Sequence, residues 1–291
     1  EWHLSVCPGS LMERRWPGLR SPLTTIASSP RQRTVRAHFI LLVLLVFATP
    51  PSGATTLDDI DFFVDNMVQG GARDQFPAMT NPTPVRPDEV SYVADHELVL
   101  GVYLDGEARA YPQNLGWVHE IINDELAGRF ISVSFCPLTG SGQNLEAIAP
   151  DGTQVQYGVS GCLLNSNLVI FDLDDDTRYP QMAFTGLNGS RKGHQLKPLP
   201  VVETTWSFWK KLYPETTVPQ GGTGLDRSST RVQNGFQTDS IYLGDPYGEY
   251  RVDHDDIPFP PPRGFDHRLR TKNMVMGICR NEASKVYPLD H

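Results

Sequence analysis

Residues 98–112 have the sequence LVLGVYLDGEARAYP, and this stretch decides the fold class. A nearly continuous apolar run, residues 98–104, is followed by Asp105-Gly106 and then by an alternating run that ends at Tyr111. This pattern predicts a β-hairpin with a two-residue type I′ turn, because Gly tolerates the positive φ that the turn requires. We therefore expect a domain built around antiparallel strands.

The residues after this hairpin predict a mixture of short helices and strands. Residues 115–126 carry apolar side chains at helical spacing, which predicts an amphipathic helix. A strand is predicted over residues 130–135, where it ends at Cys136-Pro137. The same reasoning predicts a helix over residues 57–68, strands over 154–159 and 168–173, and a short helix over 206–213 that is capped by Thr205.

The composition agrees with a globular, turn-rich chain. The 291 residues include 39% hydrophobic and 20% charged residues, which excludes a disordered chain and a multi-span membrane protein. Gly and Pro number 25 and 24, so long helices have little room. The fold class that we expect is a strand-rich α+β single domain.

Part of the hairpin sequence recurs near the C-terminus. Val99, Gly101, Tyr111 and Pro112 match residues 275, 277, 287 and 288 at a constant offset of 176. This predicts a second hairpin and a domain with two similar halves. The second copy stops three residues after its final Pro, and a lone hairpin needs further strands to bury its face. We therefore expect a domain that is incomplete at its C-terminus.

Residues 1–54 have the features of a leader. The first Met is Met12, so we expect the residues before it to be upstream read-through. Six Arg residues precede the apolar run Phe39–Phe47, which at nine residues is far shorter than the roughly 20 needed to span a bilayer. Ser52-Gly53-Ala54 supplies small residues for cleavage, so the segment predicts a secretory signal peptide and an exported, periplasmic or extracellular protein. Residues 55–87 are then an N-terminal helix with a Pro-rich linker, and residues 88–291 are the domain.

The charge narrows the choice of partners. The formal net charge is −9. Without the leader's six Arg and two Glu, the chain keeps 19 basic and 32 acidic residues, a net charge of −13. Such a chain repels nucleic acid and, after signal cleavage, anionic membrane surfaces. The expected partner is an unidentified small molecule or protein, and the sequence identifies neither a cofactor nor a metal.

Several separate motifs stand out along the chain: residues 99–124 (VLGVYLDGEARAYPQNLGWVHEIIND), 133–142 (VSFCPLTGSG), 157–172 (YGVSGCLLNSNLVIFD), 204–216 (TTWSFWKKLYPET) and 245–250 (DPYGEY). Residues 87–288 are similar to the secreted bacterial and archaeal family called domain of unknown function 3179. The resemblance implies the extent of the domain and its export, but no reaction. Cys136 stands where the family has its Cys-Pro-Leu motif, whereas Cys162 stands where relatives usually carry an apolar residue, which makes it a poor candidate for a shared role.

Cys136 and His119 form the candidate catalytic pair. Cys136 lies at the end of a predicted strand, and His119 lies on the apolar stripe of the preceding predicted helix. With Glu120 or Asp124 to orient the imidazole, this is the minimum set for an activated thiolate, and it could also belong to a soft metal site. Two other roles for Cys136 stay open: a disulfide with Cys162, and simple packing, since free Cys is often buried.

Polar residues near the same loop are candidate ligand contacts. They are Thr139, Ser160, Asn165, Asn167 and Tyr111. Three functions follow from different classes: a binding module whose pocket lies among the Cys136 loop, the His119 helix and residues 160–167; a thiol- or metal-dependent enzyme; and a structural surface protein without a small-molecule site.

Overall fold

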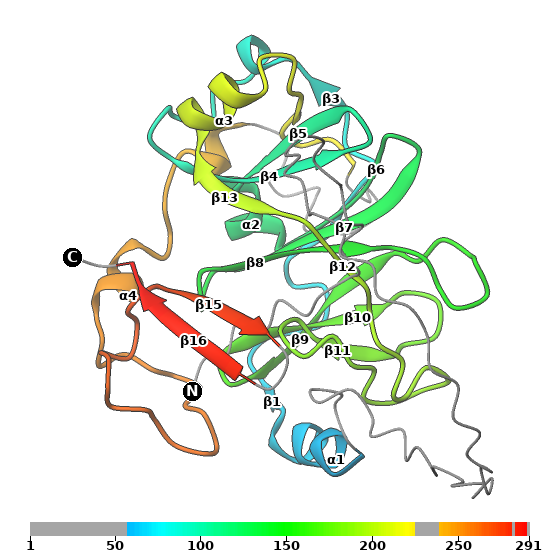
Figure 1. The fold of residues 1–291 in the computed structure, drawn as a ribbon, viewed down its shortest axis with the longest axis vertical. Helices are drawn as coiled ribbons and strands as arrows, with labels where there is room; N and C mark the ends of the chain where they lie inside the picture. The colour runs from blue at the N-terminus through cyan, green and yellow to red at the C-terminus, as the bar shows by residue number, and fades with distance from the viewer. Residues whose placement is uncertain (1–56, 225–238, 281–282, 290–291) are drawn as a thin grey trace, which may run out of the picture.

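The computed structural model describes residues 57–224, 239–280 and 283–289, and Figure 1 shows how they are arranged. The helices are short, and most of the ordered chain lies in sheets, as the expected α+β class requires. The helices are α1 (Leu57–Asn66), α2 (Gln113–His119), α3 (Trp206–Leu212) and α4 (Gly248–Val252), with 3₁₀ turns η1 (Pro87–Glu89) and η3 (Asp239–Tyr242). The strands are β1 (Val68–Gln69), β2 (Met79–Thr80), β3 (Pro84–Val85), β4 (Leu98–Leu104), β5 (Glu107–Pro112), β6 (Ile121–Leu126), β7 (Arg129–Cys136), β8 (Ser141–Glu146), β9 (Tyr157–Leu164), β10 (Asn167–Asp172), β11 (Arg178–Pro180), β12 (Pro198–Leu199), β13 (Val202–Thr205), β14 (Val218–Pro219), β15 (Val275–Arg280) and β16 (Ala283–Pro288).

Three sheets follow one another along the long axis in Figure 1. The upper sheet has the strand order β13-β4-β5, the middle sheet β12-β8-β7-β6-β2, and the lower sheet β1-β9-β10-β11. Helix α3 covers the upper sheet, and α1 lies beside the lower one. Two further pairs, β14-β3 and β15-β16, form small separate sheets.

The predicted hairpin is confirmed as β4 and β5. Asp105 and Gly106 form its two-residue turn with φ angles of 46° and 101°, as a type I′ turn requires. Glycine is required at residue 101 in β4, because a Cβ atom there would lie 2.3 Å from ring carbons of Trp209. Trp209 belongs to α3, whose predicted Thr205 cap is also confirmed.

The predicted helix over residues 115–126 is wrong in its second half. Helix α2 ends at His119, Glu120 takes a left-handed conformation with φ 57°, and the chain continues as strand β6. Ile121 and Ile122 favour a strand because they are β-branched, and Ala127-Gly128 makes the tight turn that returns the chain as β7. The helical spacing of the apolar residues was therefore shared by two different elements.

The lower sheet extends further than the sequence pattern predicts. Strand β9 continues through Ser160 and Gly161, where the sequence suggests a break, and turns at Asn165-Ser166 into β10. Residues 77–87, expected as part of a linker, also join the sheets, since β2 pairs with β6 and β3 pairs with β14. Strand β8 and the short strands β11 to β13 were not predicted either.

The middle sheet separates two hydrophobic cores. Along β7, Ile131, Val133 and Phe135 face the core shared with the upper sheet, α2 and α3. Cys136 belongs to the second core, which is shared with β9 and β10. A third, small cluster joins β9 and β10 to α1. The alternation of β7 thus places Cys136 between the middle and lower sheets.

The second predicted hairpin is present as β15 and β16. Val275 pairs with Pro288 and Met276 with Tyr287, which are the same pairings at offset 176 as Val99 with Pro112 and Leu100 with Tyr111. Met276, Ile278 and Tyr287 are exposed, unlike their counterparts in the first hairpin. The wider similarity of two halves remains a prediction.

No helix among the described residues is both long enough and apolar enough to cross a membrane. The expected signal peptide lies outside the described residues.

Candidate functional site

A cavity of about 190 Å³ lies where the middle and lower sheets meet the segments from residues 70–76 and 247–259. Its wall is mostly apolar, and Glu120 is the only acidic or basic side chain among the described residues that line it. The other polar side chains in the wall are Gln75, Cys162 and Tyr247. The remaining lining residues are Gly70, Gly71, Ala72, Phe76, Leu138, Val159, Gly161, Leu163, Leu168 and Phe259.

The backbone of Glu120 is held in a conformation that non-glycine residues rarely adopt. Its φ of 57° ends helix α2, and its N–H donates to the carbonyl oxygen of Gly116 at 3.0 Å. Its own carbonyl oxygen accepts a 2.7 Å hydrogen bond from the N–H of Phe135 in β7. These hydrogen bonds of its N–H group and its carbonyl oxygen hold Glu120 in the strained conformation. Strained backbone conformations are often found at functional positions.

The carboxyl group of Glu120 has an unusual environment. No described residue donates a hydrogen bond to it or forms an ion pair with it. Glu120 keeps some accessible surface because it lines the cavity, but protein surrounds it, and this desolvation raises its pKa to about 8. The side chain is therefore a carboxyl group that exchanges its proton near neutral pH.

A close backbone approach forms one side of the cavity. The N–H groups of Gly70 and Gly71 both donate to the carbonyl oxygen of Gly161 in β9, at 2.9 Å. Gly161 has a φ of 73°, and a Cβ atom there would lie 2.4 Å from the carbonyl oxygen of Gly71. Glycine is therefore required at residue 161 for this segment to lie against the strand.

Cys136 has the properties of a packed thiol. Its side chain is buried, and its Sγ donates a long 3.7 Å hydrogen bond to the carbonyl oxygen of Ser166. Burial, together with the nearby Glu120, raises the pKa of the thiol to about 11. An activated nucleophile needs the opposite shift.

Neither Cys136 nor Cys162 forms a disulfide, since both are free thiols. Cys162 is buried, and its Sγ donates to Gln69 Oε1 at 3.3 Å. The side chain of Cys279 lies outside the described residues. The expected alternative of a Cys136–Cys162 bridge is therefore wrong for this structure.

His119 lies on α2 and is buried, but its ring nitrogens bind other groups. Nδ1 lies 2.8 Å from the carbonyl oxygen of Pro77, and Nε2 lies 2.8 Å from the hydroxyl of Tyr242. Burial lowers the pKa of His119 to about 4, although the bond to Pro77 opposes the shift. Neither His119 nor Cys136 lines the cavity. The arrangement does not resemble an activated Cys–His pair.

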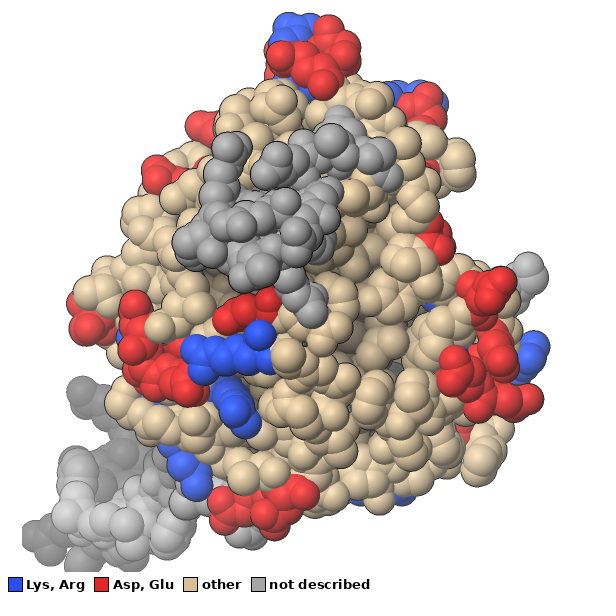
Figure 2. Space-filling model, turned by 180° about the vertical axis from the view of Figure 1, so that it is seen from behind, with Lys and Arg blue, Asp and Glu red and all other residues tan. Residues whose placement is uncertain are grey.

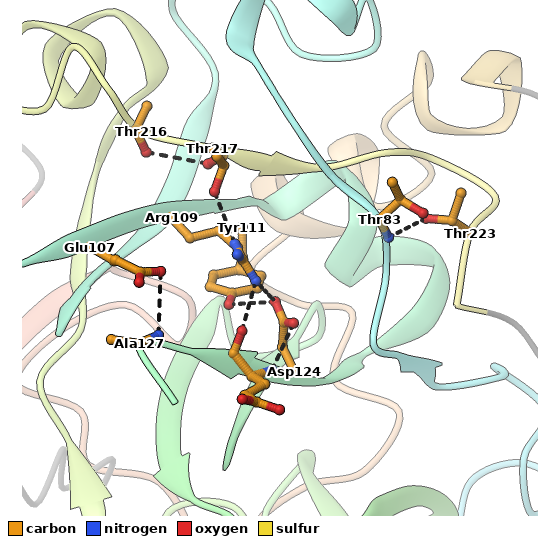
Figure 3. Close-up of polar contacts among 10 residues, drawn as sticks. Thr83, Glu107, Arg109, Tyr111, Asp124, Ala127, Thr216, Thr217 and Thr223 are labelled. Carbon is orange, nitrogen blue, oxygen red and sulfur yellow. Dashed lines mark hydrogen bonds and ion pairs between the residues drawn. The ribbon is translucent and has the colours of Figure 1, made fainter. Parts of the chain in front are cut away.

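Asp124 and Tyr111 belong to a separate buried network, which Figure 3 shows. Asp124 Oδ2 accepts from Arg109 Nη1 at 2.7 Å and from the hydroxyl of Tyr111 at 2.8 Å. Arg109 Nε also donates to Thr217 Oγ1 at 3.0 Å. This network joins β5 to β6 and the segment before β14, so the carboxylate of Asp124 contacts Arg109 and Tyr111 rather than His119.

The remaining polar candidates divide into two groups. Asn167 Nδ2 lies 2.9 Å from Thr139 Oγ1 and 2.9 Å from Ser141 Oγ, so the structure brings Thr139 and Asn167 together. Ser160 donates to the carbonyl oxygen of Val169 and accepts from the N–H of Cys162, which is a structural role in β9. Asn165 forms the β9–β10 turn with a φ of 54°.

The charged groups of the described residues could form a metal centre or, on one face, a basic surface only if they were clustered. Within residues 57–224, 239–280 and 283–289, no group of three or more His, Cys, Asp or Glu side chains could hold a metal ion. On the face shown in Figure 2, Lys and Arg side chains of the described chain lie beside Asp and Glu and form no continuous basic surface.

Sequence reasoning did not predict most of the residues that line this cavity. It identified Glu120 only as a helper of His119, and it did not find Tyr247 or residues 70–72. Burial near Glu120 and Cys136 raises the pKa of Tyr247 to about 12. Residues 245–250 carry one of the motifs of the family resemblance, and that motif was the available signal for Tyr247.

The comparisons with known proteins agree with that resemblance. A family model described as "Protein of unknown function (DUF3179)" matches residues 73–291. No curated protein and no solved structure matches the chain. The matched residues include the Glu120 cavity, except for Gly70, Gly71 and Ala72. Because the model matches most of its length, the chain belongs to the DUF3179 family of proteins of unknown function.

Proposed function

We propose that this protein is a ligand-binding module that holds a small organic cation, such as a primary amine, in the Glu120 cavity. The observation that carries the proposal is a carboxyl group in a mostly apolar wall, with no partner among the described residues. A buried ionised carboxylate is costly unless a positive charge or a hydrogen-bond donor compensates for it. No Lys, Arg or His among the described lining residues supplies that charge, so a ligand is the natural source.

The aromatic residues of the wall support the same ligand class. Phe76, Tyr247 and Phe259 line the cavity together with Glu120. Ring faces attract an ammonium group, most strongly where water is excluded. The volume of about 190 Å³ is below that of ordinary drug-sized pockets, which favours a ligand of few heavy atoms.

We also propose that the protein acts outside the cytoplasm. The support is the order of features in residues 1–54, with basic residues, a short apolar run and small residues at the cleavage position. Detection of a mature N-terminus near residue 55 in exported protein would test this proposal.

Calorimetric titration with propylamine tests the binding proposal. The carboxyl group of Glu120 is protonated below its pKa of about 8, so pairing with an ammonium group releases a proton. At pH 7 we expect close to one proton released per amine bound, read from titrations in two buffers of different ionisation enthalpy. Below pH 8 the affinity should fall about tenfold for each unit of pH, because deprotonation must accompany binding.

Two variants and two analogues complete the test. Glu120→Gln should lower propylamine affinity at least about tenfold, the scale of one lost charge-assisted pair. Glu125→Gln, the same change at an exposed residue of β6, should leave the affinity within about twofold. Equal binding of propionate or propanol, or binding without proton release at pH 7, would contradict the proposal.

A further inference from the structure

A second and larger cavity, of about 800 Å³, lies between α1, the β9–β10 turn and the loop of residues 261–268. Its size falls in the range of ordinary small-molecule pockets. Phe62 and Phe63 of α1 and Phe265 of the loop line it, so part of the wall suits an apolar group. It shares no lining residue with the Glu120 cavity.

This cavity carries an arginine without an ion-pair partner among the described residues, whereas the charged group of the first cavity is a carboxyl group. Arg268 Nε lies 2.9 Å and 2.8 Å from the two carboxylate oxygens of Asp266, so these two lining residues neutralise one another. Arg263 has no such partner in the described part of the chain. Its guanidinium carbon lies 4.1 Å from the ring centre of Phe62, which fixes the cation beside an apolar surface.

A buried acceptor also lines the cavity. Asn167 is 4% exposed, and its Oδ1 accepts no hydrogen bond from any group that the structure describes. The amide nitrogen of Asn167 faces Gln181, whose Oε1 accepts at 2.8 Å from both Asn167 Nδ2 and Ser141 Oγ. The Oδ1 atom has almost no accessible surface, so the cavity presents Arg263 and the phenylalanines to a ligand rather than this acceptor.

We infer that this cavity binds an organic acid whose carboxylate pairs with Arg263 and whose apolar body lies among the three phenylalanines. Arginine is suited to this role because its planar guanidinium matches a carboxylate with two parallel hydrogen bonds. The site is independent of the proposed amine site, since different residues and the opposite charge carry it.

This inference is tested by titrating the full chain with 3-(4-hydroxyphenyl)propionate. Ligand-detected NMR and calorimetry measure the binding. We expect saturable binding, and at least about tenfold weaker binding of 4-ethylphenol, which lacks the carboxylate. Arg263→Gln should weaken binding of the acid by at least about tenfold, whereas Arg263→Lys should keep part of it because the charge remains.

Arg270→Gln is the matched control, because Arg270 is exposed and does not line the cavity. Its affinity for the acid should stay within about twofold of the wild type. Arg263 is also exposed, so its variants should keep the melting temperature of the wild type, which circular dichroism checks. The absence of saturable binding up to about 10 mM, an equal loss in Arg270→Gln, or equal binding of 4-ethylphenol would each overturn the inference.

Discussion

The Nε2 atom of His119 lies 2.8 Å from the hydroxyl oxygen of Tyr242, and that hydroxyl also accepts a 3.1 Å hydrogen bond from the N–H of Gly222. Because the Pro77 carbonyl can only accept, the proton of the neutral imidazole belongs on Nδ1, and Nε2 accepts from Tyr242. This arrangement joins α2 to η3 and the segment before β2. His119 therefore has a structural role, and its neighbour Glu120 lines the cavity.

His119 should make stability depend on acid pH. Its pKa is about 4 in the folded chain against 6.5 for the ordinary group, so the unfolded chain binds more protons between these values. The contribution of His119 to stability should thus fall by about 3 kcal/mol as pH drops from 6.5 to 4. Urea unfolding across this range measures this contribution as the difference in stability between the wild type and His119→Gln, which should move in favour of the variant at acid pH. The exposed His96→Gln should keep the wild-type profile, and a His119→Gln profile parallel to that of the wild type would contradict the prediction.

The contribution of Glu120 to stability should change with pH in the opposite direction to that of His119. Its pKa is about 8 when folded against 4.5 ordinarily, so the folded chain binds more protons between these values. Stability should fall as pH rises from 4.5 to 8, by on the order of 3–5 kcal/mol. Glu120→Gln removes this loss, so the variant should be more stable than the wild type at pH 9 and similar to it at pH 5. A variant less stable than the wild type at pH 9 would contradict the prediction, because it would mean that the carboxylate is already stabilised by a partner.

Cys136 should be unreactive in the folded protein. Its burial and raised pKa of about 11 leave little thiolate at neutral pH. Iodoacetamide at pH 7.5 should leave Cys136 unmodified in the native chain and modify it fully in guanidinium, as peptide mass spectrometry reads. Rapid native alkylation of Cys136 would restore the thiol-enzyme hypothesis.

Loss of the carboxylate of Asp124 should destabilise the fold strongly. Asp124→Ala leaves the buried Arg109 charge and the Tyr111 hydroxyl without their shared acceptor, which costs about 3–5 kcal/mol. Tyr111→Phe removes one hydrogen bond to the carboxylate and should cost about 1–3 kcal/mol. Chemical denaturation measures both values. A loss below about 1 kcal/mol for Asp124→Ala would mean that the network contributes little.

Gly101 should tolerate no side chain. Gly101→Ala places a Cβ atom against Trp209, whose indole N–H is fixed by a 2.9 Å bond to Thr216 Oγ1, so the ring cannot move away cheaply. We expect a loss of about 1–3 kcal/mol from overpacking. Gly244→Ala is the control, because its Cβ would meet no atom within 4 Å, and it should stay within about 0.5 kcal/mol of the wild type.

Local sequence determined the features that depend on neighbouring residues. Asp105-Gly106 specified the hairpin turn, Thr205 specified the start of α3, and the alternation before Cys136 specified β7. It also specified the strand-rich class and the family. These signals are local because turn dihedrals, helix caps and strand alternation act within a few residues.

Only the tertiary structure decided where α2 ends and what each candidate residue contacts. Residues 115–126 satisfied a helical pattern, but pairing of β6 with β7 replaced the last turns of the helix. The environments of Glu120, Cys136 and Asp124 depend on segments brought from residues 70–76, 109–111 and 247–259. Desolvation and partner geometry arise from such distant contacts. Sequence spacing therefore identified only part of the site, including Glu120, and the tertiary contacts determined which residues line it and what each one contacts.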